Sequence, residues 1–273
     1  MISSGTKFAE GRSYRLPQAF MTIEEPFTLK ILTVNTHKGF TALNRRFILH
    51  ELRDAIRATQ ADIVFLQEVL GAHQHHASRF ARWPSTSQYE FLADSIWQAY
   101  AYGRNAVYPH GHHGNAVLSK FPIEHYDNID VSVGKHEKRG LLHCVLKLPD
   151  AGTEVHAICV HLGLQERHRS SQVGYLCKLI ESEIPPDAPL VVAGDFNDWR
   201  MRSQRALTGR SGLKEIYSEK HGGAARTFPA RFPILRLDRI YVRNVRDFNP
   251  VALASRPWTH LSDHAPLAAE LKL

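Results

Sequence analysis

The chain has 273 residues, of which 43% are hydrophobic and 22% charged, as in an ordinary globular protein large enough to bury a core. Its 34 Lys and Arg outnumber 27 Asp and Glu, and the net charge of +7 favours anionic partners such as nucleic acid, phospholipid headgroups or phosphorylated metabolites. Three cysteines (Cys144, Cys159 and Cys177) without CxxC spacing argue against a disulfide framework or a thiolate zinc site.

No stretch approaches the roughly 20 apolar residues of a membrane span, and residues 1–29 lack the apolar core of a signal peptide. We therefore expect a cytoplasmic protein, either free or working at the surface of the inner membrane. Residues 1–28 are mixed and polar, which indicates a loosely ordered leader. A single domain is expected at 29–273.

Apolar runs bounded by turn residues predict strands, and apolar residues at helical spacing predict helices. In chain order we expect a strand at 29–34, a helix at 45–59, and strands at 62–66, 141–148 and 153–160, then a helix at 165–183 and strands at 190–193, 235–242 and 267–273. The basic run of Arg200, Arg202, Arg205 and Arg210 is expected to form a solvated helix face. The loop 226–233, RTFPARFP, is either an exposed loop that contacts phosphates or rings, or a packed hairpin loop.

Five of these strands deliver polar residues at or near an end: Asn35, Glu68, His161, Asp195 with Asn197, and Asp263 with His264. Carboxylates and amides are costly to bury, so strands that lead straight into them indicate a cleft. Alternate residues of an extended chain face the same way, which would turn Asp195 and Asn197 towards that cleft together. Taken alone, the GDFND stretch is explained equally well by an Asp/Asn turn.

Two further residues stand out for their neighbours. Asp238 shares the apolar face of its strand with Ile240 and Val242, and an acid in that position needs a histidine or arginine partner. Asn115 follows Gly114, which would let the backbone approach a ligand or make a tight turn before a strand.

Together these residues supply carboxylates, imidazoles and amides, and no P-loop, GxSxG or CxxC pattern competes with them. Hydrolysis of a phosphate ester needs this inventory: a divalent ion neutralises the phosphate, a base activates water, and amide or imidazole donors hold the developing charge. Oxygen ligands without thiolates favour Mg²⁺ or Mn²⁺ over zinc.

The same residues, in order, carry a resemblance to a known family. The set consists of Asn35, LQE ending at Glu68, GNAVLS at 114–119, His161, GDFN at 194–197, LDRI around Asp238 and SDH at 262–264. It resembles the endonuclease/exonuclease/phosphatase superfamily, the DNase I-like group that includes abasic-site nucleases, neutral sphingomyelinases and inositol-phosphate 5-phosphatases. The resemblance spans about residues 30–273, and the overall texture is most similar to small uncharacterised bacterial members.

The resemblance implies an α/β fold in the form of a four-layer sandwich, with two packed mixed β-sheets flanked by helices and the strand ends forming one cleft. It also implies roles for individual residues: Glu68 binds Mg²⁺ or Mn²⁺ with help from Asn35; Asp195 and His264 orient and deprotonate the attacking water, with either as the base; Asn197 and His161 hold phosphate oxygens; Asp263 binds a second metal or supports the metal ligands; and Asp238 orients a catalytic imidazole. Arg139 and Asn115 are expected to bind substrate, Arg139 as a hypothetical phosphate clamp.

Departures from the family pattern narrow the function. His37 stands where abasic-site nucleases carry an aspartate, and no counterpart of their catalytic tyrosine is found, which disfavours abasic-site repair. The favoured function is a Mg²⁺-dependent phosphodiesterase acting on a phospholipid headgroup or another small phosphodiester. A nonspecific DNA or RNA endonuclease is the alternative, and a binding module that has lost turnover is the third possibility.

Overall fold

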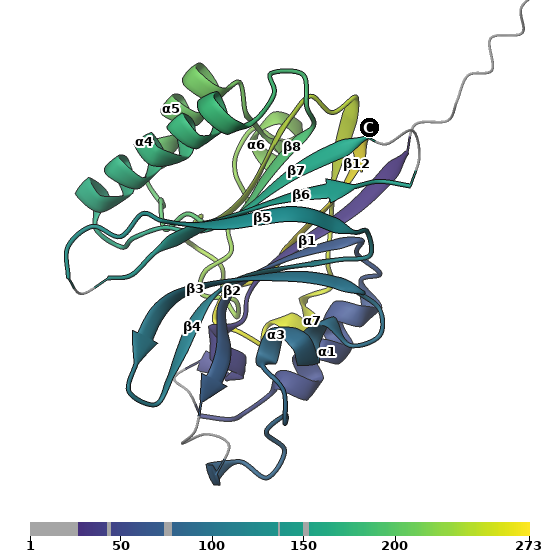
Figure 1. Cartoon of the computed structure of the whole chain (residues 1–273), viewed down its shortest axis with the longest axis vertical. Coiled ribbons are helices and arrows are strands. Elements are labelled where there is room, and N and C mark those ends of the chain that lie inside the picture. The colour runs from purple at the N-terminus through teal and green to yellow at the C-terminus, as the bar shows by residue number, and fades with distance from the viewer. Residues whose placement is uncertain (1–26, 43–44, 74–77, 136, 150–152) are drawn as a thin grey trace, which may run out of the picture.

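In the computed structural model, two six-stranded sheets lie face to face, with helices on both outer surfaces (Figure 1). The structure describes residues 27–42, 45–73, 78–135, 137–149 and 153–273. The predicted four-layer sandwich of two mixed sheets is confirmed. The leader predicted at 1–28 lies outside the described residues except for its last two, of which Thr28 begins the first strand.

Sheet one contains, in spatial order, β11 (Asp247–Val251), β12 (Leu267–Lys272), β1 (Thr28–Asn35), β2 (Ile63–His73), β4 (Gly111–Ser119) and β3 (Ala99–Tyr108). Sheet two contains β5 (Ile123–Asp130), β6 (Gly140–Lys147), β7 (Glu154–His161), β8 (Leu190–Asp195), β10 (Asp238–Arg243) and β9 (Lys214–Glu215). The helices are α1 (Leu49–Ala58), α3 (Gln88–Ala93), α4 (Glu166–Glu183), α5 (Arg202–Ser211), α6 (Ile216–His221) and α7 (Ser255–Trp258), with a 3-10 turn η1 at His37–Gly39.

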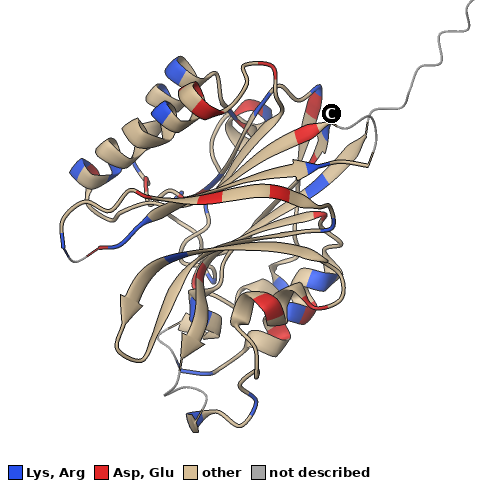
Figure 2. Ribbon diagram, in the orientation of Figure 1, with Lys and Arg blue, Asp and Glu red and all other residues tan. Residues whose placement is uncertain are grey.

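Three apolar layers hold the sandwich together. One lies between the sheets and includes Phe65 and Leu142; the second packs the outer face of sheet one against α1 and α3; the third packs the outer face of sheet two against α4. The central strands β2, β7 and β8 are buried on both faces, which explains why their sequences are continuous apolar runs instead of alternating ones. The arginines of the 200–210 run are exposed on and before α5, as predicted for a solvated helix face (Figure 2).

Each sheet contains one parallel pair of strands joined by a crossover helix: β1 and β2 through α1, and β7 and β8 through α4. The remaining pairs are antiparallel. The carboxyl ends of a parallel pair meet at one edge of the sheet, so Asn35 lies beside Gln67 and His161 beside Asp195. The polar strand ends predicted from the sequence therefore gather at the same edge of the sandwich.

Some local predictions differ from the structure. The helix predicted at 45–59 begins at Leu49, and the strand predicted at 62–66 continues to His73. Gly114 makes neither a turn nor room for a ligand; it lies inside β4, where an added Cβ would come within 1.8 Å of the Gly103 carbonyl oxygen, so the close approach is to strand β3. Among the described residues no helix is long and apolar enough to cross a membrane.

Candidate active site

A hollow of about 400 Å³ opens where the strand ends of both sheets meet; we call it the strand-end cleft. Seven of the ten predicted site residues line it: Glu68, Arg139, His161, Asp195, Asn197, Asp263 and His264. Its other lining residues are apolar: Leu164, Trp199, Phe228, Leu235 and Leu237. The cleft therefore combines a polar floor with apolar walls.

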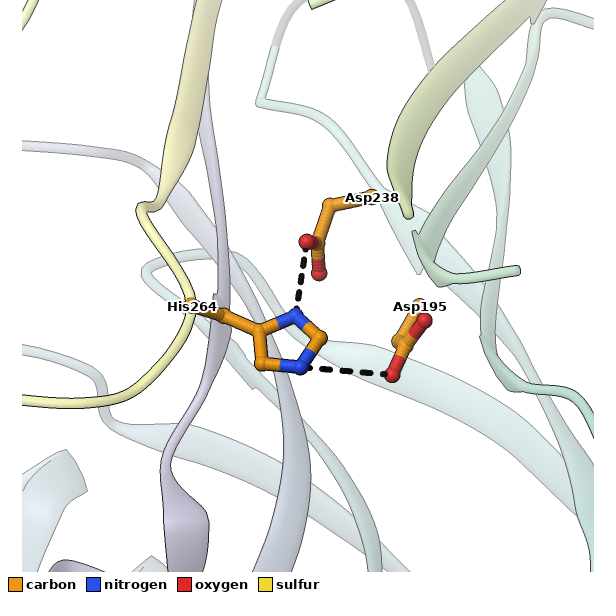
Figure 3. Close-up of side chains that lie close together, drawn as sticks. All are labelled: Asp195, Asp238 and His264. Carbon is orange, nitrogen blue, oxygen red and sulfur yellow. Dashed lines mark hydrogen bonds and ion pairs between the residues drawn. The ribbon is translucent and has the colours of Figure 1, made fainter. Parts of the chain in front are cut away.

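The centre of the cleft is an imidazole between two carboxylates (Figure 3). The Nδ1 atom of His264 lies 2.8 Å from Oδ2 of Asp238, and its Nε2 lies 3.9 Å from Oδ2 of Asp195. The loop that carries His264 is fixed by Ser262, whose hydroxyl accepts a bond from the His264 amide at 3.1 Å and donates to the Asn35 carbonyl at 2.6 Å. Asp238 thus has the histidine partner that its apolar surroundings required.

Burial and charge set the protonation of this array. Burial by itself lowers the pKa of His264, but the carboxylates of Asp238 and Asp195 outweigh it and raise the pKa to about 10. Burial raises the pKa of Asp195 to about 7, and the nearby His264 opposes that rise. At neutral pH the imidazole is therefore protonated, while Asp195 is close to its midpoint.

Asp195 is also the meeting point of the two sheets. Its Oδ1 accepts a bond from the Asn197 amide at 2.9 Å. Besides His264 Nε2 at 3.9 Å, three side-chain nitrogens lie within 3.5 Å of its Oδ2: Asn197 Nδ2 at 3.3 Å, Asn35 Nδ2 at 3.4 Å and His161 Nε2 at 3.5 Å. Asn35 comes from sheet one and the other three residues from sheet two or the loop after it, so side chains from both sheets hold one carboxylate.

His161 and Asn197 present neutral polar groups beside that carboxylate. Burial and the nearby guanidinium of Arg139 hold the pKa of His161 well below its ordinary value of 6.5. Asn197, at a left-handed φ of 51°, donates from Nδ2 to the Leu162 carbonyl at 3.0 Å. Both side chains are buried and fixed by neighbours, as expected for groups that orient a ligand.

A second group of charges surrounds Glu68. A β-bulge between Leu66 and Val69 gives Glu68 a left-handed φ of 56° and brings its side chain into the cleft wall, whereas Gln67 remains buried between the sheets. Lys38 Nζ lies 3.4 Å and His37 Nδ1 4.0 Å from its Oε2. Burial would raise the pKa of Glu68, but His161, Lys38 and His37 outweigh burial and lower the pKa to about 2.

Asp263 completes this acidic group. Its Oδ1 lies 3.3 Å from Nδ1 of His37, the same nitrogen that faces Glu68. Asn35 is also tied to this turn, because its Oδ1 accepts a bond from the His37 amide at 3.1 Å. The predicted metal residues Glu68, Asn35 and Asp263 therefore all contact His37, the two carboxylates at its imidazole and Asn35 at its backbone amide.

Two sets of described residues offer donors for a metal ion. In the first, Asp195, Asp238 and His264, one ligand atom from each lies within 4.8 Å of the others, but the bond between Asp238 and His264 already uses Nδ1. The second is the predicted set, in which Glu68 and Asp263 supply carboxylate oxygens and Asn35 an amide oxygen. Hard oxygen donors of this kind suit Mg²⁺ or Mn²⁺.

The two predicted substrate-binding residues have different surroundings. Arg139 lines the cleft, with Nη2 bound to Glu137 at 2.8 Å and Nε bound to the Leu162 carbonyl at 3.2 Å. Asn115 is fully buried away from the lining and donates to the Gly140 carbonyl at 3.0 Å, which ties β4 of sheet one to β6 of sheet two.

Sequence reasoning missed the partners that lie far away along the chain. The sequence indicated no role for Lys38, and it marked His37 only as a departure from the pattern of abasic-site nucleases. Phe228 packs its ring 5.0 Å from the His264 ring, and its backbone pairs with Leu235. The loop 226–233 is therefore a hairpin whose base packs into the cleft, and its exposed tip carries Phe232.

The sequence matches the model of the Endonuclease/Exonuclease/phosphatase family over residues 32–264. It is 58% identical over 249 residues to the uncharacterized protein YbhP of Escherichia coli, and the aligned region covers 91% of this chain and 98% of that protein. The same identity and coverage hold for the uncharacterized protein YbhP of Shigella flexneri.

Solved structures share the architecture at low sequence identity. An endonuclease/exonuclease/phosphatase from Beutenbergia cavernae superposes with a TM-score of 0.72 at 21% identity, over 90% of this chain and 72% of that one. TDP2 of D. rerio, complexed with a single-strand DNA product, superposes with a TM-score of 0.66 at 17% identity, over 90% of this chain and 99% of that one. At such identities the likeness is one of fold, whereas the family model spans most of the sequence. The chain belongs to the endonuclease/exonuclease/phosphatase family.

Proposed function

We propose that the protein is a phosphodiesterase that uses Mg²⁺ or Mn²⁺ to hydrolyse a phospholipid headgroup or another small phosphodiester by attack of an activated water. Members of the family are hydrolases that act on phosphate esters, nucleases among them. The observation that carries the proposal is the array of Asp238, His264 and Asp195, the last two of which line the same cleft as the acidic residues Glu68 and Asp263.

The acidic group is the proposed metal site. Glu68 would be the principal ligand, with Asn35 beside it and Asp263 as a ligand or as support for the others. Two carboxylates facing one basic nitrogen need positive charge, and a divalent cation supplies more of it than a histidine does. When bound, such an ion neutralises phosphate charge and lowers the pKa of a coordinated water.

The remaining residues bind the phosphate and move the proton. Asp195 would take the proton of the water, the protonated His264 beside it would orient that carboxylate and the water, and Asp238 holds the imidazole by its Nδ1. Asn197 and His161 border the same carboxylate, and the N–H that each directs towards Asp195 would turn to the non-bridging phosphate oxygens as negative charge builds, while the other Asn197 N–H stays on the Leu162 carbonyl. These roles for phosphate binding and proton transfer involve no other described residue of the cleft.

The rim of the cleft favours a substrate with an apolar portion. Leu164 and Trp199 line the cleft and are 70% and 47% exposed. Phe232 and Ile234, at the tip of the hairpin whose base lines the cleft, are 75% and 55% exposed. Nucleobases stack on aromatic rings, but the exposed aliphatic side chains of Leu164 and Ile234 offer no such surface and suit acyl chains instead. We therefore propose that the protein acts in the cytoplasm, at the surface of the inner membrane.

Nucleic acid is the second candidate substrate. The excess of basic residues, the Arg200 guanidinium 4.4 Å from the Trp199 ring, and the fold shared with the DNA-bound D. rerio protein favour it. Stacking on Trp199 and Phe232 would be its signature, together with a steep loss of affinity as salt is raised.

The test is a metal-dependent hydrolysis screen of the wild type and His264→Ala. The panel holds bis-p-nitrophenyl phosphate, plasmid DNA, RNA, inositol phosphates and vesicles of anionic phospholipid. We expect hydrolysis of bis-p-nitrophenyl phosphate and of the lipid with Mg²⁺ or Mn²⁺, abolished by a chelator and by the substitution. DNA cleavage without lipid turnover would favour the nuclease, and binding of a phosphate ligand without turnover of any substrate would indicate a binding module.

A further inference from the structure

A second hollow, of about 520 Å³, adjoins the strand-end cleft. The two share Arg139 and Leu164 in their walls. Four segments build it: the loop between β5 and β6 contributes Lys135, Glu137 and Lys138, the start of α4 contributes Gln165, Arg167 and His168, and β3 and β4 contribute Ala106 and His113. We call it the basic pocket, and Figure 2 shows Lys and Arg along the loop between β5 and β6.

The charges of the basic pocket are unbalanced. Glu137 is its single acidic lining residue, and that carboxylate is occupied: it accepts bonds from Arg139 Nη2 at 2.8 Å and from the Leu164 amide at 3.1 Å. Lys135, Lys138 and Arg167 form no ion pair with any described residue, in contrast to Arg57, Arg202 and Arg210 on the helices. Three cations that line one hollow and form no ion pair favour a bound anion.

Independent features of the walls point to the same ligand. His168 is 9% exposed, lines the pocket, and its Nδ1 has no hydrogen-bond partner among the described residues; the nearest carboxylate oxygen, Oε2 of Glu137, lies 3.7 Å away. The Nδ1 atom of His113 is also buried without a partner in the described chain. The pocket is further bordered by the first turn of the 18-residue helix α4, whose N-cap Gln165 makes no side-chain capping bond.

We propose that the basic pocket binds a second phosphate group of the substrate. The inference rests on the proposed function, because it assumes that the scissile phosphodiester occupies the strand-end cleft. Arg139, in the wall between the two hollows, then lies between the two phosphates, and Glu137 fixes its orientation. The preferred substrate class is therefore a molecule that carries a phosphodiester and, a short distance along, another phosphate.

Two chromogenic diesters that differ only by a phosphate provide the test: the p-nitrophenyl ester of thymidine 5′-phosphate, with and without a phosphate on the 3′-oxygen. We expect kcat/KM to be about tenfold higher for the diester with two phosphates, as for a hydrogen bond to a charged group. Lys138→Ala and Arg167→Ala should remove most of that advantage by raising KM and should leave the one-phosphate diester unchanged. Lys178→Ala, which removes an exposed charge from the same helix outside the pocket, is the control.

The outcomes separate the pocket from the catalytic proposal. Equal kcat/KM for the two diesters, or equal losses in Lys138→Ala and Lys178→Ala, would overturn the second-phosphate pocket and leave the phosphodiesterase intact. Hydrolysis of neither diester would instead count against the proposed function, and calorimetric titration of the same variants with pyrophosphate then decides the pocket by itself. A phosphorylated dinucleotide and a glycerol-based bis-phosphodiester are then compared as competitive inhibitors of the two-phosphate diester. The stronger inhibitor identifies whether nucleic acid or a lipid headgroup supplies the second phosphate.

Discussion

Replacing Asp238 by Asn tests the central array with a minimal change of shape. The carboxylate accepts the Nδ1–H bond of His264 at 2.8 Å and so leaves Nε2 facing Asp195. An amide in its place removes one of the negative charges that raise the pKa of His264, and its NH₂ group can donate to Nδ1, so the ring loses its Nδ1 proton and keeps the one on Nε2. We expect kcat to fall because the ring is then neutral and no longer places a positive charge beside Asp195.

The magnitude follows from the burial of the pair. Asp238 is 2% exposed and His264 7%, so water screens their interaction little. A hydrogen bond to a charged group contributes about 1.5–3 kcal/mol, which corresponds to about 10- to 150-fold in rate. We expect a loss of kcat in that range, with little change in KM, because Asp238 does not line the cleft.

The chain supplies its own control for this substitution. His125 and Asp127 form a pair of the same composition at 2.6 Å on β5, but their side chains are 66% and 62% exposed. Exposed pairs of this kind contribute little, so Asp127→Asn should leave both kcat and stability unchanged. The assay is metal-dependent hydrolysis of bis-p-nitrophenyl phosphate, accompanied by ¹⁵N NMR of the histidine rings to read the protonation state of His264.

One result would refute this reasoning. If Asp238→Asn keeps the wild-type kcat while NMR shows that the His264 ring has lost a proton, then the array does not carry the proton transfer. A large loss of kcat shared by Asp127→Asn would equally remove the argument, because it would trace the effect to the substitution type and not to burial.

Three further predictions concern metal binding, the backbone and pH. Glu68→Gln should lower Mg²⁺-dependent turnover by about a thousandfold and weaken calorimetric Mg²⁺ binding, and full activity would exclude the metal assignment. Gly194→Ala should reduce the free energy of unfolding by about 3 kcal/mol or more, because φ is 144° and the added Cβ would lie 2.0 Å from a β7 carbonyl oxygen. The control is Gly209→Ala on α5, where the space around the glycine is open, and it should not reduce the free energy of unfolding. Burial lowers the pKa of His156 and lowers that of His143 to about 4. Below pH 6.5 the unfolded chain therefore binds more protons than the folded one, and the free energy of unfolding decreases as the pH is lowered, by about 2 kcal/mol for His143 near pH 5. Denaturation of the double variant His143→Leu, His156→Leu should show a flatter pH dependence, and an unchanged slope would contradict it.

The strands that build the site could be predicted because they are buried on both faces. The apolar runs that end at Asn35, His161 and Asp195 need no distant information, and the parallel pairing of such strands places their ends at one edge. The edge strands could not be found in this way. β5 reads IEHYDNID and is mostly exposed, so its extended form depends on pairing with β6, and β11 contains Pro250, which an edge position tolerates.

The site was predicted as a set of residues but not as an arrangement. The direction of Glu68 depends on a bulge with a positive φ, for which the LQEV sequence carries no local signal. The contact of His37 with Asp263 joins residues from opposite ends of the domain and follows only from the finished fold. The need of Asp238 for a partner was visible in the sequence, but the choice of His264 over an arginine was not.

The polar groups of the cleft come from both sheets, so the site forms only when the two sheets have folded and packed together. Asn35 and Asp195, 160 residues apart, meet through one hydrogen bond, and Asp238 of sheet two binds the histidine that precedes β12 of sheet one. A chain in which only one sheet has formed thus lacks a complete set of groups. If these groups carry out the proposed hydrolysis, we expect such a nascent or partly unfolded chain to be inactive, so that activity would report the docking of one sheet on the other.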